Sequence, residues 1–128
     1  MDGYEQAASL LRALSHPVRL RILEVLASER EACVCHLESH LGQRQAYISQ
    51  QLTRLREAGL VSTRREGLNV FYSLADVSVL PLLEAGRTCA TDYARRRGRR
   101  LAFRPPGSIV AASCTCPKCL SLDRTPAV

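Results

Sequence analysis

Four stretches near the start of the chain carry hydrophobic residues three or four positions apart, which is the spacing of one helix face. The stripes are Ala7, Leu11 and Leu14; Val18, Ile22, Val25 and Leu26; Val34, Leu37 and Leu41; and Ile48, Leu52 and Leu55. Pro17 suits the first turn of the second helix. Gly42 breaks the third helix, and Gly59 stands like a C-terminal glycine after a fourth helix from about Arg44 to Ala58.

The period of the pattern changes after the fourth helix. Residues 61–66 and 70–74 predict two strands, and the Gly-Leu-Asn sequence at 67–69 predicts the turn of a β-hairpin. A fifth helix, rich in valine and leucine, is predicted from about Val77 to the region of Tyr93. It is more apolar than a helix exposed to water requires, so we expect it to be covered.

These elements predict a mainly α fold with about five helices and a two-stranded hairpin. We assign them to one domain, residues 1–93. Residues 94–128 are predicted to form a separate tail, because they open with an arginine-rich run, continue through a Pro-Pro-Gly sequence and end in a cysteine cluster.

The order of helix, glycine turn, helix and basic hairpin is that of a winged helix-turn-helix, whose second helix enters the major groove of DNA. The fourth helix is expected to present polar side chains there: Arg44, Gln45, Tyr47, Ser49, Gln50, Gln51 and Arg54. Glutamine can pair with adenine and arginine with guanine. On the hairpin, Arg64 and Arg65 are expected to reach phosphates or the minor groove.

Charge and composition agree with a nucleic-acid partner. The net charge is +6, and Lys118 is the only lysine, so arginine carries nearly all the positive charge. No P-loop, dinucleotide fingerprint or Ser/His/Asp order is present, so we expect no enzyme. No stretch suits a membrane span or a signal peptide, so we expect a cytoplasmic protein whose six cysteines are ligands or redox-active thiols.

The cysteines form two clusters. Cys33 and Cys35 flank one residue at the start of the third helix, and Cys114, Cys116 and Cys119 lie in the tail. Residues two apart on a regular helix point in nearly opposite directions, so the first pair can share one ion only at a frayed helix start. The tail cysteines can supply a third ligand to that pair or form a site of their own.

Ligation by thiolates alone favours soft ions. Trivalent arsenic or antimony would accept three thiolates and is favoured, whereas cadmium, lead or zinc would prefer a fourth ligand. Cys89 on the fifth helix is more typical of a buried packing thiol. His36 and His40 have a spacing that can bind zinc, although the HExxH pattern is missing.

Three stretches resemble the ArsR/SmtB family of metal-responsive repressors. They are Leu14–Leu23 (LSHPVRLRIL), Cys33–Leu37 (CVCHL) and Leu55–Val61 (LREAGLV). The resemblance covers about residues 5–90. It implies a winged-helix homodimer paired through its first and last helices. It also implies an apo form that binds double-stranded operator DNA and releases it when metal binds, with target genes for efflux or detoxification.

The chain departs from the family pattern at three places. His16 precedes the proline where the family often has aspartate, and Arg44 replaces the serine that often caps the recognition helix. The Asp-x-His pair that binds zinc on the last helix in some members is here Asp76-Val77-Ser78. A zinc site on that helix is therefore not expected.

The sequence thus predicts a repressor that releases its operator when a thiophilic ion binds cysteine thiolates. Two alternatives remain open. The same fold can serve as a cysteine redox or sulfide sensor, in which two thiols oxidise instead of binding metal. The tail cysteines can also build a small zinc-stabilised interaction module, which would show no sequence-specific DNA binding.

Overall fold

The helices begin at residues suited to start them. In the computed structural model, which describes residues 2–103, the side chain of Asp2 accepts a hydrogen bond from the backbone of Glu5, and Glu5 accepts one from Asp2. Pro17 opens the second helix as expected, and His16 caps it by accepting a hydrogen bond from the Val18 N–H. Gly42 ends the third helix in the left-handed conformation, with a φ of 63°.

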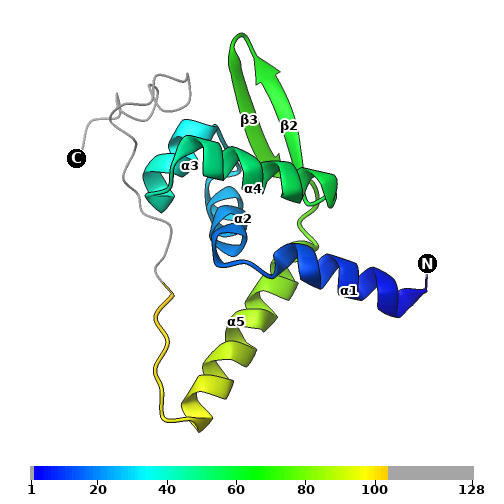
Figure 1. Ribbon diagram of the computed structural model, residues 1–128, viewed down its shortest axis with the longest axis vertical. Helices are drawn as coiled ribbons and strands as arrows, with labels where there is room; N and C mark the ends of the chain where they lie inside the picture. Colours follow the sequence, from blue (N-terminus) through cyan, green and yellow to red (C-terminus); the bar gives the residue numbers. More distant parts are fainter. Residues whose placement is uncertain (1, 104–128) are drawn as a thin grey trace.

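The predicted order of five helices and a hairpin is confirmed (Figure 1). The elements are α1 (Gly3–Leu14), α2 (Pro17–Glu29), β1 (Glu31–Ala32), α3 (Val34–Leu41), α4 (Gln45–Glu57), β2 (Val61–Glu66), β3 (Asn69–Leu74) and α5 (Val79–Arg96). α5 begins later than expected and runs past residue 93, where we had ended the domain. The division from a tail at 94–128 stays a prediction, since residues 104–128 lie outside the described residues.

The sheet has one strand more than predicted. β1 pairs antiparallel with β3, which gives a three-stranded sheet in the order β1-β3-β2. A strand of two residues is too short to show an alternating pattern, so the sequence carried no sign of it. Its pairing places Ala32, next to Cys33, opposite Tyr72 of the hairpin.

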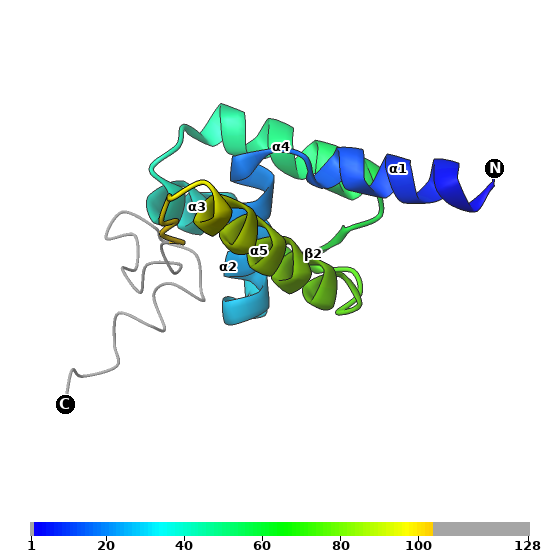
Figure 2. The same ribbon diagram turned by 90° about the horizontal axis from the view of Figure 1, so that it is seen from below.

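The core lies between α2, α3, α4 and the sheet. Its fully buried side chains include Ile22, Leu26, Leu37, Leu52 and Phe71. α1 and α5 project from this core, and Figure 2 shows α5 crossing in front of α2. The only buried side chains on the two projecting helices are Leu14 in α1 and Val79 and Ala94 in α5.

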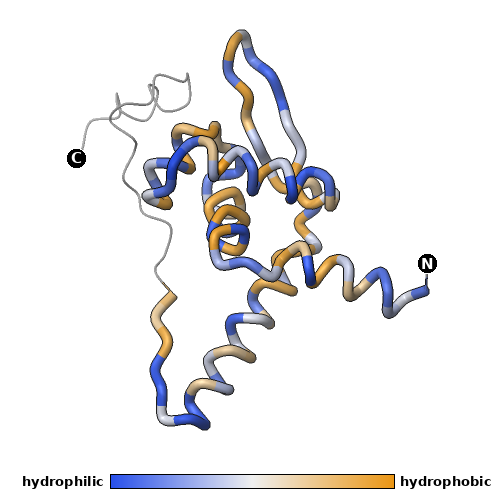
Figure 3. Tube along the Cα trace, in the orientation of Figure 1, coloured by the Kyte–Doolittle hydropathy of each residue, from blue (hydrophilic) through white to orange (hydrophobic). Residues whose placement is uncertain are grey.

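The projecting helices nevertheless carry hydrophobic residues among hydrophilic ones (Figure 3). Arg87 of α5 donates two hydrogen bonds, of 2.8 and 2.6 Å, to the carboxylate of Glu24 in α2. A groove of about 810 Å³ lies between α1, α2 and α5. It is lined largely by apolar side chains, among them Leu11, Leu20 and Leu83. Among the described helices, none is long and apolar enough to cross a membrane.

Candidate functional site

The exposed face of α4 is polar and basic. Gln45, Gln50 and Arg54 are exposed on it, and Arg44 is exposed at the N-cap position. No side-chain hydrogen bond caps this helix, as the missing serine implied. Thr53 also lies on this face, where we had not expected a contact residue. The half-buried Ser49 comes one turn after Gln45, and Thr53 comes one turn after Ser49, so together with Gln50 and Arg54 these side chains form a strip along the helix.

Gln51, expected on the outer face, lies in the interior instead. Only 7% of the residue is exposed, and its side-chain oxygen accepts a hydrogen bond of 2.8 Å from Nε of Arg19. A second guanidinium nitrogen of Arg19 donates to the carbonyl of Ala13. Gln51 comes one turn after Ile48 and one before Leu55, on the buried side of α4. It therefore fixes α4 against α2.

Tyr47 and Ser49 are half-buried on α4. The hydroxyl of Tyr47 lies 3.0 Å from Nε2 of His16. Since Nδ1 of His16 accepts from the backbone, a neutral ring carries its proton on Nε2 and donates to Tyr47. The histidine that departs from the family pattern thus joins the start of α2 to α4.

The two arginines of the hairpin are exposed, and Arg64 is held by acidic neighbours. It donates to both carboxylate oxygens of Glu31, at 2.7 and 3.2 Å, and to Glu66 at 3.2 Å. These hydrogen bonds, first that to Glu31 and then that to Glu66, raise the pKa of the Arg64 guanidinium. The guanidinium also lies over the ring of Phe71, 4.7 Å from its centre. Arg64 must exchange these partners to reach a phosphate, whereas Arg65 is simply exposed at the next position.

Cys33 and Cys35 lie together at the start of α3. Cys33 is the N-cap residue and has an extended backbone, with φ of −86° and ψ of 168°. It therefore lies outside the regular helix, and the two sulfurs lie 2.7 Å apart. The extended backbone at the helix start therefore brings together two sulfurs that regular helical spacing would hold apart.

A pocket beside Cys35 connects the start of α3 with α4. Cys35 lines a pocket of about 440 Å³ that extends to Gly42 and to Arg44, the N-cap of α4. Two thiolates on one tetrahedral ion, each at about 2.3 Å, lie about 3.8 Å apart, so the sulfurs need to separate by roughly 1 Å. The helix N-terminus favours negative charge at this place.

The remaining cysteines do not join this pair within the described residues. Cys114, Cys116 and Cys119 lie outside those residues, so their part in the site stays a prediction. Cys89, expected as a buried packing thiol, is exposed on α5 and lines the apolar groove.

Sequence comparison connects the chain to known regulators. Residues 16–63 match the family described as bacterial regulatory protein, arsR family. An uncharacterized HTH-type transcriptional regulator of Methanocaldococcus jannaschii is 38% identical over 84 residues, which span 66% of this chain and 94% of that protein. The biofilm growth-associated repressor of Agrobacterium fabrum is 48% identical over 80 residues, 62% of this chain and 68% of that protein.

Solved structures of such regulators have the same fold. The crystal structure of Rv0081 from Mycobacterium tuberculosis is similar with a TM-score of 0.67 and 36% identity, covering 77% of this chain and all (100%) of that one. The antimony-specific transcriptional repressor AntR gives a TM-score of 0.63 and 31% identity over 73% of this chain and 83% of that one. A homodimeric winged helix-turn-helix DNA-binding domain from Mycobacterium bovis gives 0.64 and 28%, over 78% and 90%.

Proposed function

The chain belongs to the ArsR/SmtB family of winged-helix transcriptional repressors, and we propose that it releases operator DNA when a thiophilic ion binds Cys33 and Cys35. Members of this family are DNA-binding transcriptional regulators and not enzymes. The observation that carries the proposal is the close approach of two sulfurs at the start of α3. α3 leads through Gly42 directly into α4, so an ion that separates the sulfurs would strain the support of the DNA-reading helix.

Trivalent arsenic or antimony is the favoured inducer. Each accepts three thiolates, and Cys114, Cys116 or Cys119 would supply the third, from the same or the partner protomer. The similarity to an antimony-specific repressor supports this choice. Cadmium, lead or zinc would need a fourth ligand. We place the protein in the cytoplasm, where thiols stay reduced and operator DNA is present.

The DNA-binding surface that we propose combines the strip on α4 with the hairpin. Its members are Arg44, Gln45, Ser49, Gln50, Arg54, Arg64 and Arg65. Tyr47 and Gln51 act instead as positioning residues, because the hydrogen bonds described above direct them toward α2. Two copies of this surface would read an inverted repeat, with half-sites about one helical turn apart or a multiple of it.

The homodimer that we propose uses α1 and α5. The apolar groove between them includes Leu11, which is 53% exposed in the single chain. A second copy would cover this surface across a two-fold axis. A relative of the same fold is described as homodimeric.

A redox or sulfide sensor is the second candidate, and the sulfur separation favours it as well. Cys33 and Cys35 would lose two protons and two electrons to peroxide or polysulfide and form one disulfide bond. Mass spectra recorded after peroxide or polysulfide, and in parallel after arsenite or cadmium, distinguish the two candidates. An ion adduct supports metal sensing, whereas a loss of two hydrogens without an adduct supports oxidation.

The proposed function is tested by a gel-shift competition on the full chain. We expect operator DNA to bind far more tightly than a scrambled duplex, with an affinity that falls steeply as salt rises, because phosphate contacts release counterions. Arsenite or antimonite should then release the operator. Equal binding to both duplexes would contradict the proposal that α4 recognises the operator sequence. Operator binding that neither ion changes would contradict the proposal that arsenite or antimonite is the inducer.

Two neighbouring glutamines provide a matched pair of variants. Gln50→Ala should relax the sequence preference by roughly 1–3 kcal/mol while leaving stability unchanged, because the exposed side chain reads a base. Gln51→Ala should lower the free energy of unfolding by about 1–3 kcal/mol, because it leaves the partly buried Nε of Arg19 without its acceptor. Binding to operator variants and thermal unfolding measure the two effects. If Gln51→Ala instead relaxed the sequence preference and Gln50→Ala lowered the stability, α4 would contact DNA with another face.

A further inference from the structure

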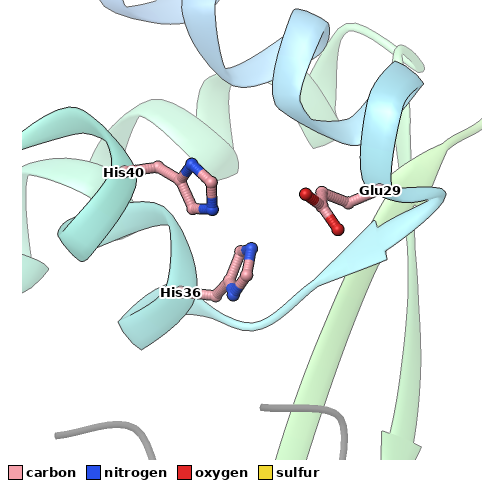
Figure 4. A group of neighbouring side chains, drawn as sticks. All are labelled: Glu29, His36 and His40. Atoms are coloured by element: carbon pink, nitrogen blue, oxygen red, sulfur yellow. The ribbon is translucent and has the colours of Figure 1, made fainter. Parts of the chain in front are cut away.

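Three metal-binding side chains converge where α2 ends beside α3. They are Glu29, His36 and His40, and Figure 4 shows a ring nitrogen of each histidine directed toward the space in front of the carboxylate. One ligand atom from each residue lies within 4.8 Å of the other two. The imidazole rings are 4.3 Å apart between their centres.

The local fold explains this convergence. His36 and His40 are one turn apart on α3, so they share a face of the helix. Glu29 is the last residue of α2, and Arg30 follows it with a φ of 69°, in the left-handed region that residues other than glycine rarely adopt. The chain reverses there into β1, which leaves the carboxylate beside the two rings (Figure 4).

The donor set suits a borderline divalent ion. Two imidazoles and one carboxylate, with water in the fourth position, are a common arrangement for zinc. Ligand atoms about 2.05 Å from a tetrahedral ion lie about 3.3 Å apart, so the three groups need only small rotations from their present separation. Burial lowers the pKa of His40 more than the neighbouring Glu29 carboxylate raises it.

We propose that Glu29, His36 and His40 form a second metal site, free of sulfur, that binds zinc or a similar divalent ion. It is chemically distinct from the Cys33–Cys35 pair, since nitrogen and oxygen donors do not select trivalent arsenic or antimony. An ion here would fasten the end of α2 to α3. The chain would then respond to two classes of ion through the same short helix.

Cobalt(II) is the probe, because its visible spectrum reports tetrahedral binding and its near-ultraviolet spectrum reports sulfur ligands. The full-length chain with all six cysteines replaced by serine should bind one equivalent of cobalt without a sulfur band. Zinc should displace the cobalt and raise the melting temperature. A chain with alanine at the same six positions, titrated in parallel, should give the same bands, so that the result does not depend on how serine affects folding.

Two variants test the ligands without touching the fully buried His36. His40→Gln and Glu29→Gln should each weaken cobalt binding by roughly tenfold or more and abolish the rise in melting temperature with zinc. Glu84→Gln, which removes an exposed carboxylate from α5, should change neither. In the cysteine-free chain, tight cobalt binding that survives both ligand variants, or the absence of cobalt binding by a folded protein, would overturn the proposal. Operator binding is not part of this test, so its outcome is independent of the proposed induction mechanism.

Discussion

The Cys33→Ser, Cys35→Ser double variant is expected to bind operator DNA as tightly as the parent chain and to stay bound when arsenite, antimonite or cadmium is added. Neither thiol lies on the exposed face of α4, so the DNA contacts remain. Arsenite and antimonite lose both thiolates that are close to that helix, and a cadmium ion held by Glu29, His36 and His40 would bind without separating the sulfurs. Gel-shift titration with each ion, together with counting of bound metal, measures both quantities.

The choice of substitution matters at Cys33. This residue is the N-cap of α3 and makes no side-chain capping bond, whereas serine is among the best N-cap residues and would stabilise the helix start by about 1 kcal/mol. A parallel Cys33→Ala, Cys35→Ala variant separates lost ligation from a stiffened helix. Cys89→Ser, which removes an exposed thiol from α5, is the matched control and should respond normally.

Two forms of this mechanism differ in the role of the tail cysteines. If Cys114, Cys116 and Cys119 complete the site, their replacement should weaken induction sharply, because two thiolates hold a trigonal ion poorly. If they form a separate site, their replacement should lower the amount of bound metal and leave some induction. Normal release from the double variant at 33 and 35 would contradict both forms and would move the sensor to the tail.

Leu11→Asp should convert the protein to a monomer and remove most of its operator affinity. Leu11 is half exposed in the single chain, so the carboxylate has little effect on the fold of one protomer. In the proposed dimer it would bury an unpaired charge in each copy, at a cost of about 3 kcal/mol or more, or roughly a hundredfold in dimer dissociation. Sedimentation at micromolar concentration and gel shift measure the two losses.

A leucine at the hairpin turn provides the control for this prediction. Leu68 is fully exposed (100%), and Leu68→Asp adds the same charge away from the groove, so the dimer should persist. A Leu11→Asp protein that remains dimeric would show that α1 does not contribute to the interface. A clean monomer of the parent chain that still binds operator tightly would contradict the dimer altogether.

The hydrophobic spacing predicted α2, α3 and α4 well because each of them buries a stripe of leucine, isoleucine or valine against the same core. The stripes of α1 and α5 were equally visible in the sequence, although within one chain these helices bury only Leu14, and Val79 and Ala94. The hairpin was predictable because the period changed after Gly59 and the turn carries glycine and asparagine. β1 was not predictable, since its two residues adopt an extended form only through pairing with β3, which lies about forty positions later in the chain.

The candidate site was predictable in composition and less so in geometry. Gln50 and Gln51 look equivalent in the sequence, and only the hydrogen bond with Arg19 assigns the second one to the interior. Cys33 and Cys35 were recognisable by spacing, but their meeting depends on the extended backbone of one residue. Glu29 could not be connected with His36 and His40, because the reversal at Arg30 leaves no pattern in the sequence.

The hydrogen bond between Tyr47 and His16 has an optical consequence. The chain has no tryptophan and four tyrosines, so its intrinsic fluorescence comes from phenol rings alone. One of these rings lies on the DNA-reading helix with its hydroxyl against His16, and Tyr72 stands opposite the residue that precedes Cys33. The tyrosine emission of an unlabelled sample therefore includes one ring on α4 and one ring on β3, opposite the residue that precedes Cys33. We expect the emission to change when DNA binds α4 or when an ion binds beside Cys33, so that binding can be followed without attaching a dye.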